Sequence, residues 1–218
     1  MSPILSHSLL NNTFIANADA TLFWEDQKIL ILSDLHLGKS GHFRKEGIAI
    51  PQNVLQQDLF RLSHQIQIYN PKKIIIVGDL FHSKSNKEHN LFVRWLKNYE
   101  HIDIHLVLGN HDILQNQFYT ENQITTHKIY LEIGTFIFTH DMYEVTVSPD
   151  KYYFSGHIHP SIAIKGTGRQ FVKLPCFYFT KQYAVLPAFG KFTGTYNIVP
   201  KKNETVLAIV KNQIIKIQ

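Results

Sequence analysis

The chain has 218 residues, of which 44% are hydrophobic and 18% charged, a composition that supports a packed core and excludes a disordered or fibrous protein. No stretch approaches the roughly 18 consecutive apolar residues that a membrane span needs, and the single cysteine, Cys176, excludes an intrachain disulfide. The 22 Lys and Arg residues exceed the 17 Asp and Glu residues by five, a mild bias toward anionic partners such as nucleic acid. The N-terminus does not resemble a secretory signal, so we expect a cytoplasmic protein with one domain, 1–218.

The first half of the sequence alternates strand-like and helix-like segments. A hairpin is expected over 13–16 and 20–24. Apolar, β-branched runs predict buried parallel strands, whose two faces are covered by other layers, at 28–33, 72–77 and 105–108. Apolar residues at helical spacing predict helices over 53–67 and 87–99.

The second half is rich in short strands separated by turn residues. These are expected at 129–133, 135–140, 152–157, 161–165, 171–174, 177–180, 183–186, 205–210 and 214–217. A helix-rich first half and a strand-rich second half indicate two packed sheets with helices outside them, in a single folding unit.

Polar clusters follow five of the predicted strands. They are Asp34-Leu35-His36, Gly78-Asp79, Gly109-Asn110-His111-Asp112, His140 and Gly156-His157-Ile158-His159. Ligands of α/β sheets bind beyond the carboxyl ends of strands, so we expect these clusters to meet in one crevice. If the backbone there is extended, alternation places both outer side chains of Asp-x-His, and both of His-x-His, on one side, where either pair can hold one ion.

The donor types narrow the choice of ion. Carboxylate, imidazole and amide oxygen together suit divalent Mn, Fe or Zn, and a shared carboxylate can hold two such ions about 3.5–4 Å apart for phosphoryl displacement. Taken singly, such an Asp is most often a helix cap or turn residue, and such a His a packing residue. Five ordered clusters at strand ends favour the metal interpretation.

The full set of clusters resembles the signature of the calcineurin-like metallophosphoesterases. The resemblance implies a four-layer α-β-β-α sandwich, with two mixed sheets flanked by helices and a dinuclear centre at the sheet edge. It implies that His111 lies beside the leaving group and is oriented by Asp112. The implied ligands are Asp34, His36 and His159 for one metal, Asn110, His140 and His157 for the other, and Asp79 as the bridge.

Further blocks are similar to the ligase-associated DNA damage response phosphoesterases, the PdeM-like group. These blocks are DLHLGKSGHFRKEGIAIP (34–51), GDLFHS (78–83) and LPAFGKFTG (186–194). This resemblance implies an endonuclease or phosphodiesterase of bacterial DNA repair, with DNA as its partner and an association with a DNA ligase, a helicase and an exonuclease. Of the metals that suit the donors, manganese is the one we expect. It leaves the oligomeric state open.

Substrate contacts are expected in the basic loop after the first cluster. Lys39, His42 and Arg44 follow the Asp34 cluster closely, so they either bind phosphates of a nucleic-acid strand or form a solvated surface loop. His82 either contacts the departing phosphate or is a turn residue. Two other functions remain open, namely hydrolysis of cyclic nucleotides or nucleotide anhydrides, and a non-catalytic scaffold that keeps the fold.

Overall fold

The computed structural model describes residues 3–39, 53–82, 86–166, 170–191 and 193–218. Within these ranges the first sheet contains seven strands in chain order, antiparallel from β1 to β4 and parallel from β4 to β7. Its strands are β1 (Ile4–Leu9), β2 (Asn12–Asn17), β3 (Thr21–Trp24), β4 (Ile29–Leu32), β5 (Lys73–Val77), β6 (Asp103–Val107) and β7 (Ile124–His127).

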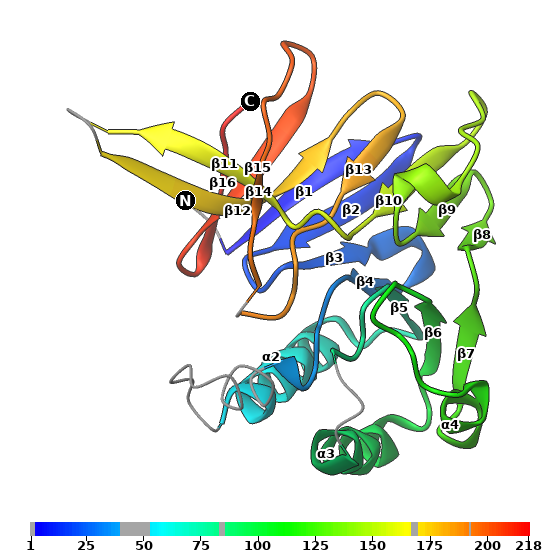
Figure 1. Ribbon diagram of the computed structural model, residues 1–218. Helices are drawn as coiled ribbons and strands as arrows, with labels where there is room; N and C mark the ends of the chain where they lie inside the picture. The colour runs from blue at the N-terminus through cyan, green and yellow to red at the C-terminus, as the bar shows by residue number, and fades with distance from the viewer. Residues whose placement is uncertain (1–2, 40–52, 83–85, 167–169, 192) are drawn as a thin grey trace.

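The second sheet has the described order β14-β11-β12-β13-β10-β9-β8, and β15 joins β12 and β16. Its first strands are β8 (Tyr130–Ile133), β9 (Phe136–Thr139), β10 (Tyr152–Ser155), β11 (Pro160–Lys165) and β12 (Phe171–Phe179). It continues with β13 (Tyr183–Val185), β14 (Tyr196–Asn197), β15 (Thr205–Val210) and β16 (Gln213–Lys216). Figure 1 shows β11 and β12 extending away from the body as a long hairpin.

The α-helices of the described ranges lie on the first sheet, in the lower part of Figure 1. They are α2 (Val54–Tyr69), α3 (Asn86–Leu96) and α4 (Asn116–Glu121), with short 3-10 turns at Glu25–Gln27, Lys97–Tyr99 and Met142–Glu144. Helix α2 ends at Asn70, whose left-handed backbone lets its N–H bond to the carbonyl of Ile66, and Pro71 then prevents continuation. None of these helices is long and apolar enough to cross a membrane.

Three apolar clusters hold the layers together. Alternate residues of β4 face opposite ways, so Leu30 packs against the helices while Ile31 packs against the second sheet. This two-sided burial explains the unbroken apolar run at 28–33. On the outer face of the second sheet, Cys176 and Tyr178 form a third cluster with Ile198. The mixed α/β class with two mixed sheets is confirmed.

Several local expectations differ from the structure. Strand β1, helix α4 and strand β7 were not predicted. Each is short and contains too few apolar residues to form a recognisable helical or alternating pattern. The strands expected at 171–174 and 177–180 form one strand, β12. It pairs with β11 up to Pro175 and with β15 from Cys176, so the proline, which has no N–H, lies where the strand changes partner.

Replacement of Phe154 tests the core between the sheets. Phe154 is completely buried, and its ring lies 5.3 Å from that of Phe138 and 5.2 Å from that of Phe14 on the opposite sheet. Phe154→Ala should lower the free energy of unfolding by about 3–5 kcal/mol, because it removes apolar contacts and leaves a cavity. Urea denaturation measures this, with Phe60→Ala as the control, since Phe60 is 74% exposed and its loss should cost less than about 0.5 kcal/mol. Equal losses would contradict the proposed core.

Candidate metal centre

The five polar clusters meet at one edge of the two sheets. Those of Asp34, Asp79 and Asn110 follow β4, β5 and β6 of the first sheet, whose parallel strands share a carboxyl edge. Those of His140 and His157 follow β9 and β10 of the second sheet, which are also parallel. The two carboxyl edges face each other, so side chains from both sheets occupy one crevice, as expected.

The backbone at the clusters is not extended. Left-handed φ angles occur at Asp34 (52°), His36 (48°), Asp79 (50°), His157 (67°) and His159 (49°). The prediction that strand-like alternation orients Asp-x-His and His-x-His is therefore wrong. Such a conformation costs a non-glycine residue on the order of 1 kcal/mol or more, so it persists only where surrounding contacts enforce it. Its concentration in these loops marks them as a strained, functional region.

One group of donor atoms forms around Asp34, His36 and His159. The Nε2 atom of His159 lies 3.2 Å from Oδ1 of Asp34 and 3.3 Å from Nε2 of His36. His36 is 5% exposed and Asp34 is fully buried, so bulk water does not solvate these donors. The three residues are close enough for one ion, since one ligand atom from each lies within 4.8 Å of the others.

A second group forms around His140. Its Nε2 atom lies 3.2 Å from Oδ1 of Asn110, 3.2 Å from Nδ1 of His157 and 3.6 Å from Oδ2 of Asp79. Asp34, Asp79 and His140 also each offer one ligand atom within 4.8 Å of the other two, close enough to share a metal ion. His157 and His159 thus belong to different groups, and the prediction that the His-x-His pair holds a single ion is wrong.

Asp79 lies between the groups. Its Oδ1 atom accepts a hydrogen bond of 2.9 Å from the backbone N–H of His111. That bond leaves Oδ2 free to face both groups, at 3.7 Å from Nε2 of His36 and 3.6 Å from Nε2 of His140. One carboxylate oxygen is therefore shared by two clusters of nitrogen and oxygen donors, which is the arrangement expected of a bridging ligand.

Hydrogen bonds to backbone carbonyls orient two of the imidazoles. Nδ1 of His159 donates to the carbonyl of Gly194 at 2.9 Å, and Nδ1 of His140 donates to that of Val77 at 3.3 Å. With Nδ1 protonated, each neutral ring directs the lone pair of Nε2 toward carboxylate or amide oxygens, which are also acceptors. Only a proton or a cation relieves such contacts, so the donor set fits divalent metal ions.

The protonation of the first group follows the same logic. Burial lowers the pKa of His36 to about 3, so this imidazole is neutral, the form that coordinates metal. Burial opposes ionisation of Asp34, but its hydrogen bond with His159 and the neighbouring histidines outweigh that effect and lower its pKa. Burial also lowers the pKa of His159, but the hydrogen bond and charge of Asp34 outweigh it, and the pKa is raised overall.

Glycines within the clusters leave room for side chains of other clusters. A Cβ atom at Gly109 would lie 2.2 Å from Oδ1 of Asp79, and one at Gly156 would lie 2.5 Å from Oδ2 of Asp34. Real Cβ atoms do not approach other atoms so closely. Each glycine therefore allows a carboxylate from another strand end to reach the centre, and the motifs are sterically interdependent.

His111 and His82 form the side of the centre next to His36. The ring of His111 lies 5.4 Å from that of His36 and 4.7 Å from that of His82. His82 is therefore brought to the centre, and its expected contact with substrate stays a prediction. Burial lowers the pKa of Lys39, and the charges of Asp79 and Asp34 partly oppose that shift. Lys39 is therefore close enough to the centre to interact with both carboxylates. His42 and Arg44 lie outside the described residues.

Asp112 joins two loops. Its Oδ2 atom accepts from the backbone N–H of Gly109 at 2.9 Å and Oδ1 accepts from that of Phe81 at 3.2 Å. Asp112 was expected to orient the His111 ring directly. Within the described residues its carboxylate instead bonds to the backbone, where it connects the loops after β5 and β6. Burial raises the pKa of Asp112 to about 7.

The family model for calcineurin-like phosphoesterases matches residues 27–181. The chain belongs to this family. Its fold is similar to that of Pseudomonas putida nuclease MPE, with a TM-score of 0.83 and 22% identity over 98% of this chain and 100% of that one. It is also similar to Yfce, a phosphoesterase from E. coli, at 13% identity over 87% of this chain and 97% of that one, but a TM-score of 0.47 is too low to support an argument. No curated protein sequence matches the chain.

Membership of the family supports a metal-dependent hydrolase of phosphate esters. Two contributors to the phosphoesterase centre were not predicted. Nε2 of His157 lies 3.7 Å from Oδ2 of Asp141, so this carboxylate can orient the ring from behind, and the Gly194 carbonyl does the same for His159. Asp141 directly follows His140, and a carboxylate next to a ligand candidate is a signal that the sequence does contain.

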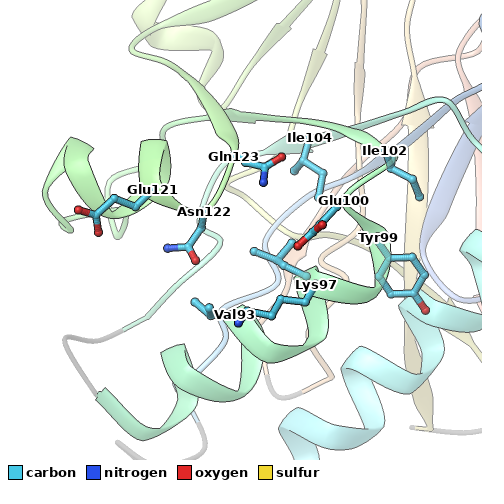
Figure 2. A pocket seen from close by; sticks show the side chains of 10 residues that line it. Val93, Lys97, Tyr99, Glu100, Ile102, Ile104, Glu121, Asn122 and Gln123 are labelled. Atoms are coloured by element: carbon cyan, nitrogen blue, oxygen red, sulfur yellow. The ribbon is translucent and has the colours of Figure 1, made fainter.

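A separate hollow lies between the end of α3 and the α4–β7 connection. Figure 2 shows Lys97, Glu100 and Glu121 among the side chains that line it, together with Ile102 and Ile104. None of its lining residues belongs to either metal group. The chemistry of this phosphoesterase is therefore assigned to the sheet edge and not to this hollow.

Gly156→Ala tests the interdependence of the clusters. The added methyl group must displace Asp34, so we expect metal affinity to fall by about 10–100-fold, as when the support of a ligand is lost. Titration calorimetry with Mn²⁺ measures the affinity. Gly166→Ala is the matched control, because its Cβ would meet only ordinary contacts at 3.8 Å. Undiminished affinity in Gly156→Ala would show that Asp34 does not depend on this glycine.

Proposed function

We propose that this phosphoesterase is a dinuclear metal-dependent phosphodiesterase that cleaves DNA. The observation that carries the proposal is the position of Asp79 Oδ2, which lies within 3.7 Å of Nε2 of His36 and of His140. Asp34, His36 and His159 would hold one ion and Asn110, His140 and His157 the other. The donor set suits manganese, with iron or zinc as alternatives.

Two bound metal ions would activate water and neutralise charge on the phosphoryl oxygens. The protein contributes by holding the ligand side chains in fixed orientations. Asp34 and Asp79 hold their orientation through backbone N–H groups of His157 and His111. Because the clusters come from both sheets, the phosphate is placed between two rigid walls, with little reorganisation needed during the reaction.

His111 is the proposed general acid. Its backbone N–H is bonded to Asp79, so its ring is held beside the centre without belonging to either donor group. A proton given to the leaving oxygen stabilises the charge that develops there when the P–O bond breaks. His82, beside His111, is proposed to contact the same side of the phosphate. Lys39, near both carboxylates, is proposed to contribute positive charge to the phosphate site.

Three observations support DNA as the substrate. The chain carries a formal charge of +5, its blocks resemble the ligase-associated repair phosphoesterases, and its fold is similar to a nuclease over nearly its whole length. The association with a ligase, a helicase and an exonuclease stays a prediction from the resemblance. A non-catalytic scaffold gives no reason for so many converging donors.

Asp79→Asn tests the shared carboxylate. The amide carries no negative charge to hold two ions, so we expect less than full dinuclear occupancy and a loss of turnover greater than about 10²-fold. Elemental analysis and cleavage of single-stranded, duplex and flapped DNA, with Mn, Fe, Zn and Mg compared, measure both. Asp150→Asn, on the exposed surface, is the matched control. Full loading of Asp79→Asn would contradict the bridging role.

The substrate class is tested with the same preparations. Binding of DNA through several phosphates should weaken steeply with salt, whereas hydrolysis of a cyclic nucleotide should respond little. Cleavage of cyclic nucleotides alone would favour the small-molecule alternative.

His111→Ala tests the general acid. Removal of the proton donor should slow DNA cleavage by about 10²–10⁴-fold and affect bis(4-nitrophenyl) phosphate far less, because 4-nitrophenolate leaves without help. Steady-state kinetics on the two substrates measure the difference, with metal content checked in the same samples. The exposed His101 supplies the control, His101→Ala. Equal slowing on both substrates would indicate a role other than protonation of the leaving group.

A further inference from the structure

A cavity of about 210 Å³ lies next to the proposed metal centre. The β2–β3 turn, helix α2, the base of the β11–β12 hairpin and the segment after β13 line it. Its lining includes Ala18, Arg61, His159, Pro175, Phe189 and Lys191.

His159 connects the cavity to the centre. Its ring lines the cavity, while its Nε2 atom faces Asp34 and His36. Lys191 lines both this cavity and the smaller hollow that contains His36 and Lys39. The imidazole ring of His159 therefore separates the cavity from the metal centre, so a group attached to a phosphate at the centre can extend into the cavity.

The charges around the cavity are largely compensated. The Arg61 guanidinium pairs with Asp58 at 3.0 Å and with Asp19 at 3.8 Å, and it also donates to the backbone carbonyl of Phe189. Its side chain is only 15% exposed. Burial raises the pKa of Asp58, and the charges of Arg61 and Lys191 oppose that shift. Two cations facing two carboxylates do not favour a second phosphate, so the cavity suits an uncharged group.

The wall chemistry suits a flat ring. Three alanines, two prolines and an isoleucine are among the residues that line it, and Thr193 and Thr195 add hydroxyls. The Arg61 guanidinium lies 4.2 Å from the centre of the buried Phe189 ring, which supports it at one wall. Apolar walls with a few hydrogen-bonding groups are typical of small-ligand sites, and guanidinium and aromatic planes stack on nucleobases.

We infer that this cavity receives the nucleobase of the nucleotide that keeps the scissile phosphate, attached through the ester oxygen that does not leave. The inference rests on the proposed function, because it requires a phosphodiester at the metal centre. It assigns Arg61 and the β2–β3 turn to recognition of a base, and it separates base recognition from the charges that bind phosphate.

The experiment compares two esters with one leaving group. The 4-nitrophenyl ester of thymidine 5′-phosphate and that of 1,2-dideoxyribose 5-phosphate differ only in the base. Manganese-loaded wild-type protein should show a KM at least about five-fold lower for the thymidine ester, the lower end of what base stacking contributes. Ala18→Phe fills the cavity from its partly exposed rim, and it should reduce this preference to about two-fold or less.

The controls distinguish the possible failures. Ala163→Phe, a half-buried alanine on β11 that does not line the cavity, should retain the preference. Metal content and kcat on the abasic ester show whether each variant is folded. Equal KM values for both esters in wild type, or an unchanged preference in a folded Ala18→Phe, would overturn the base site. Failure of wild type to hydrolyse either ester would instead contradict the proposed phosphodiesterase activity.

Discussion

A single carboxylate oxygen organises the crevice. Oδ2 of Asp79 faces the histidine of the first strand end and the histidine from the second sheet at nearly equal distances. Its partner oxygen is held by the backbone N–H of His111, so the carboxylate cannot rotate without losing that bond. The two donor groups therefore have a fixed position relative to one another.

The surrounding structure bears the energetic cost of this arrangement. Acceptor atoms face acceptor atoms, left-handed residues replace extended ones, and carboxylates are buried away from water. Each of these features destabilises an isolated loop. They persist because the two apolar clusters on either side of the first sheet, with Leu30 in one and Ile31 in the other, fix the strands from which the loops depart.

The sequence was sufficient to predict which residues gather at the sheet edge. Asp34, Asp79 and His140 each follow a short apolar run, and the carboxyl ends of parallel strands necessarily share an edge. Alternation along the chain favoured a single ion for His157 and His159, and only the resemblance to the family implied that they separate, because the separation depends on φ angles that alternation does not describe. The sequence did not predict the backbone bonds of Asp112 or the cavity beside Ala18. Those depend on tertiary contacts between segments far apart in the chain.

Each donor group draws on both sheets. Asp34 and His36 come from the first sheet and meet His159 from the second, while Asn110 comes from the first and meets His140 from the second. A cation in either position would thus fasten the two halves of the sandwich at their open rim. Any shear of one sheet along the other would pull apart both coordination shells at once, which couples the mechanical integrity of the fold to the occupancy of its rim.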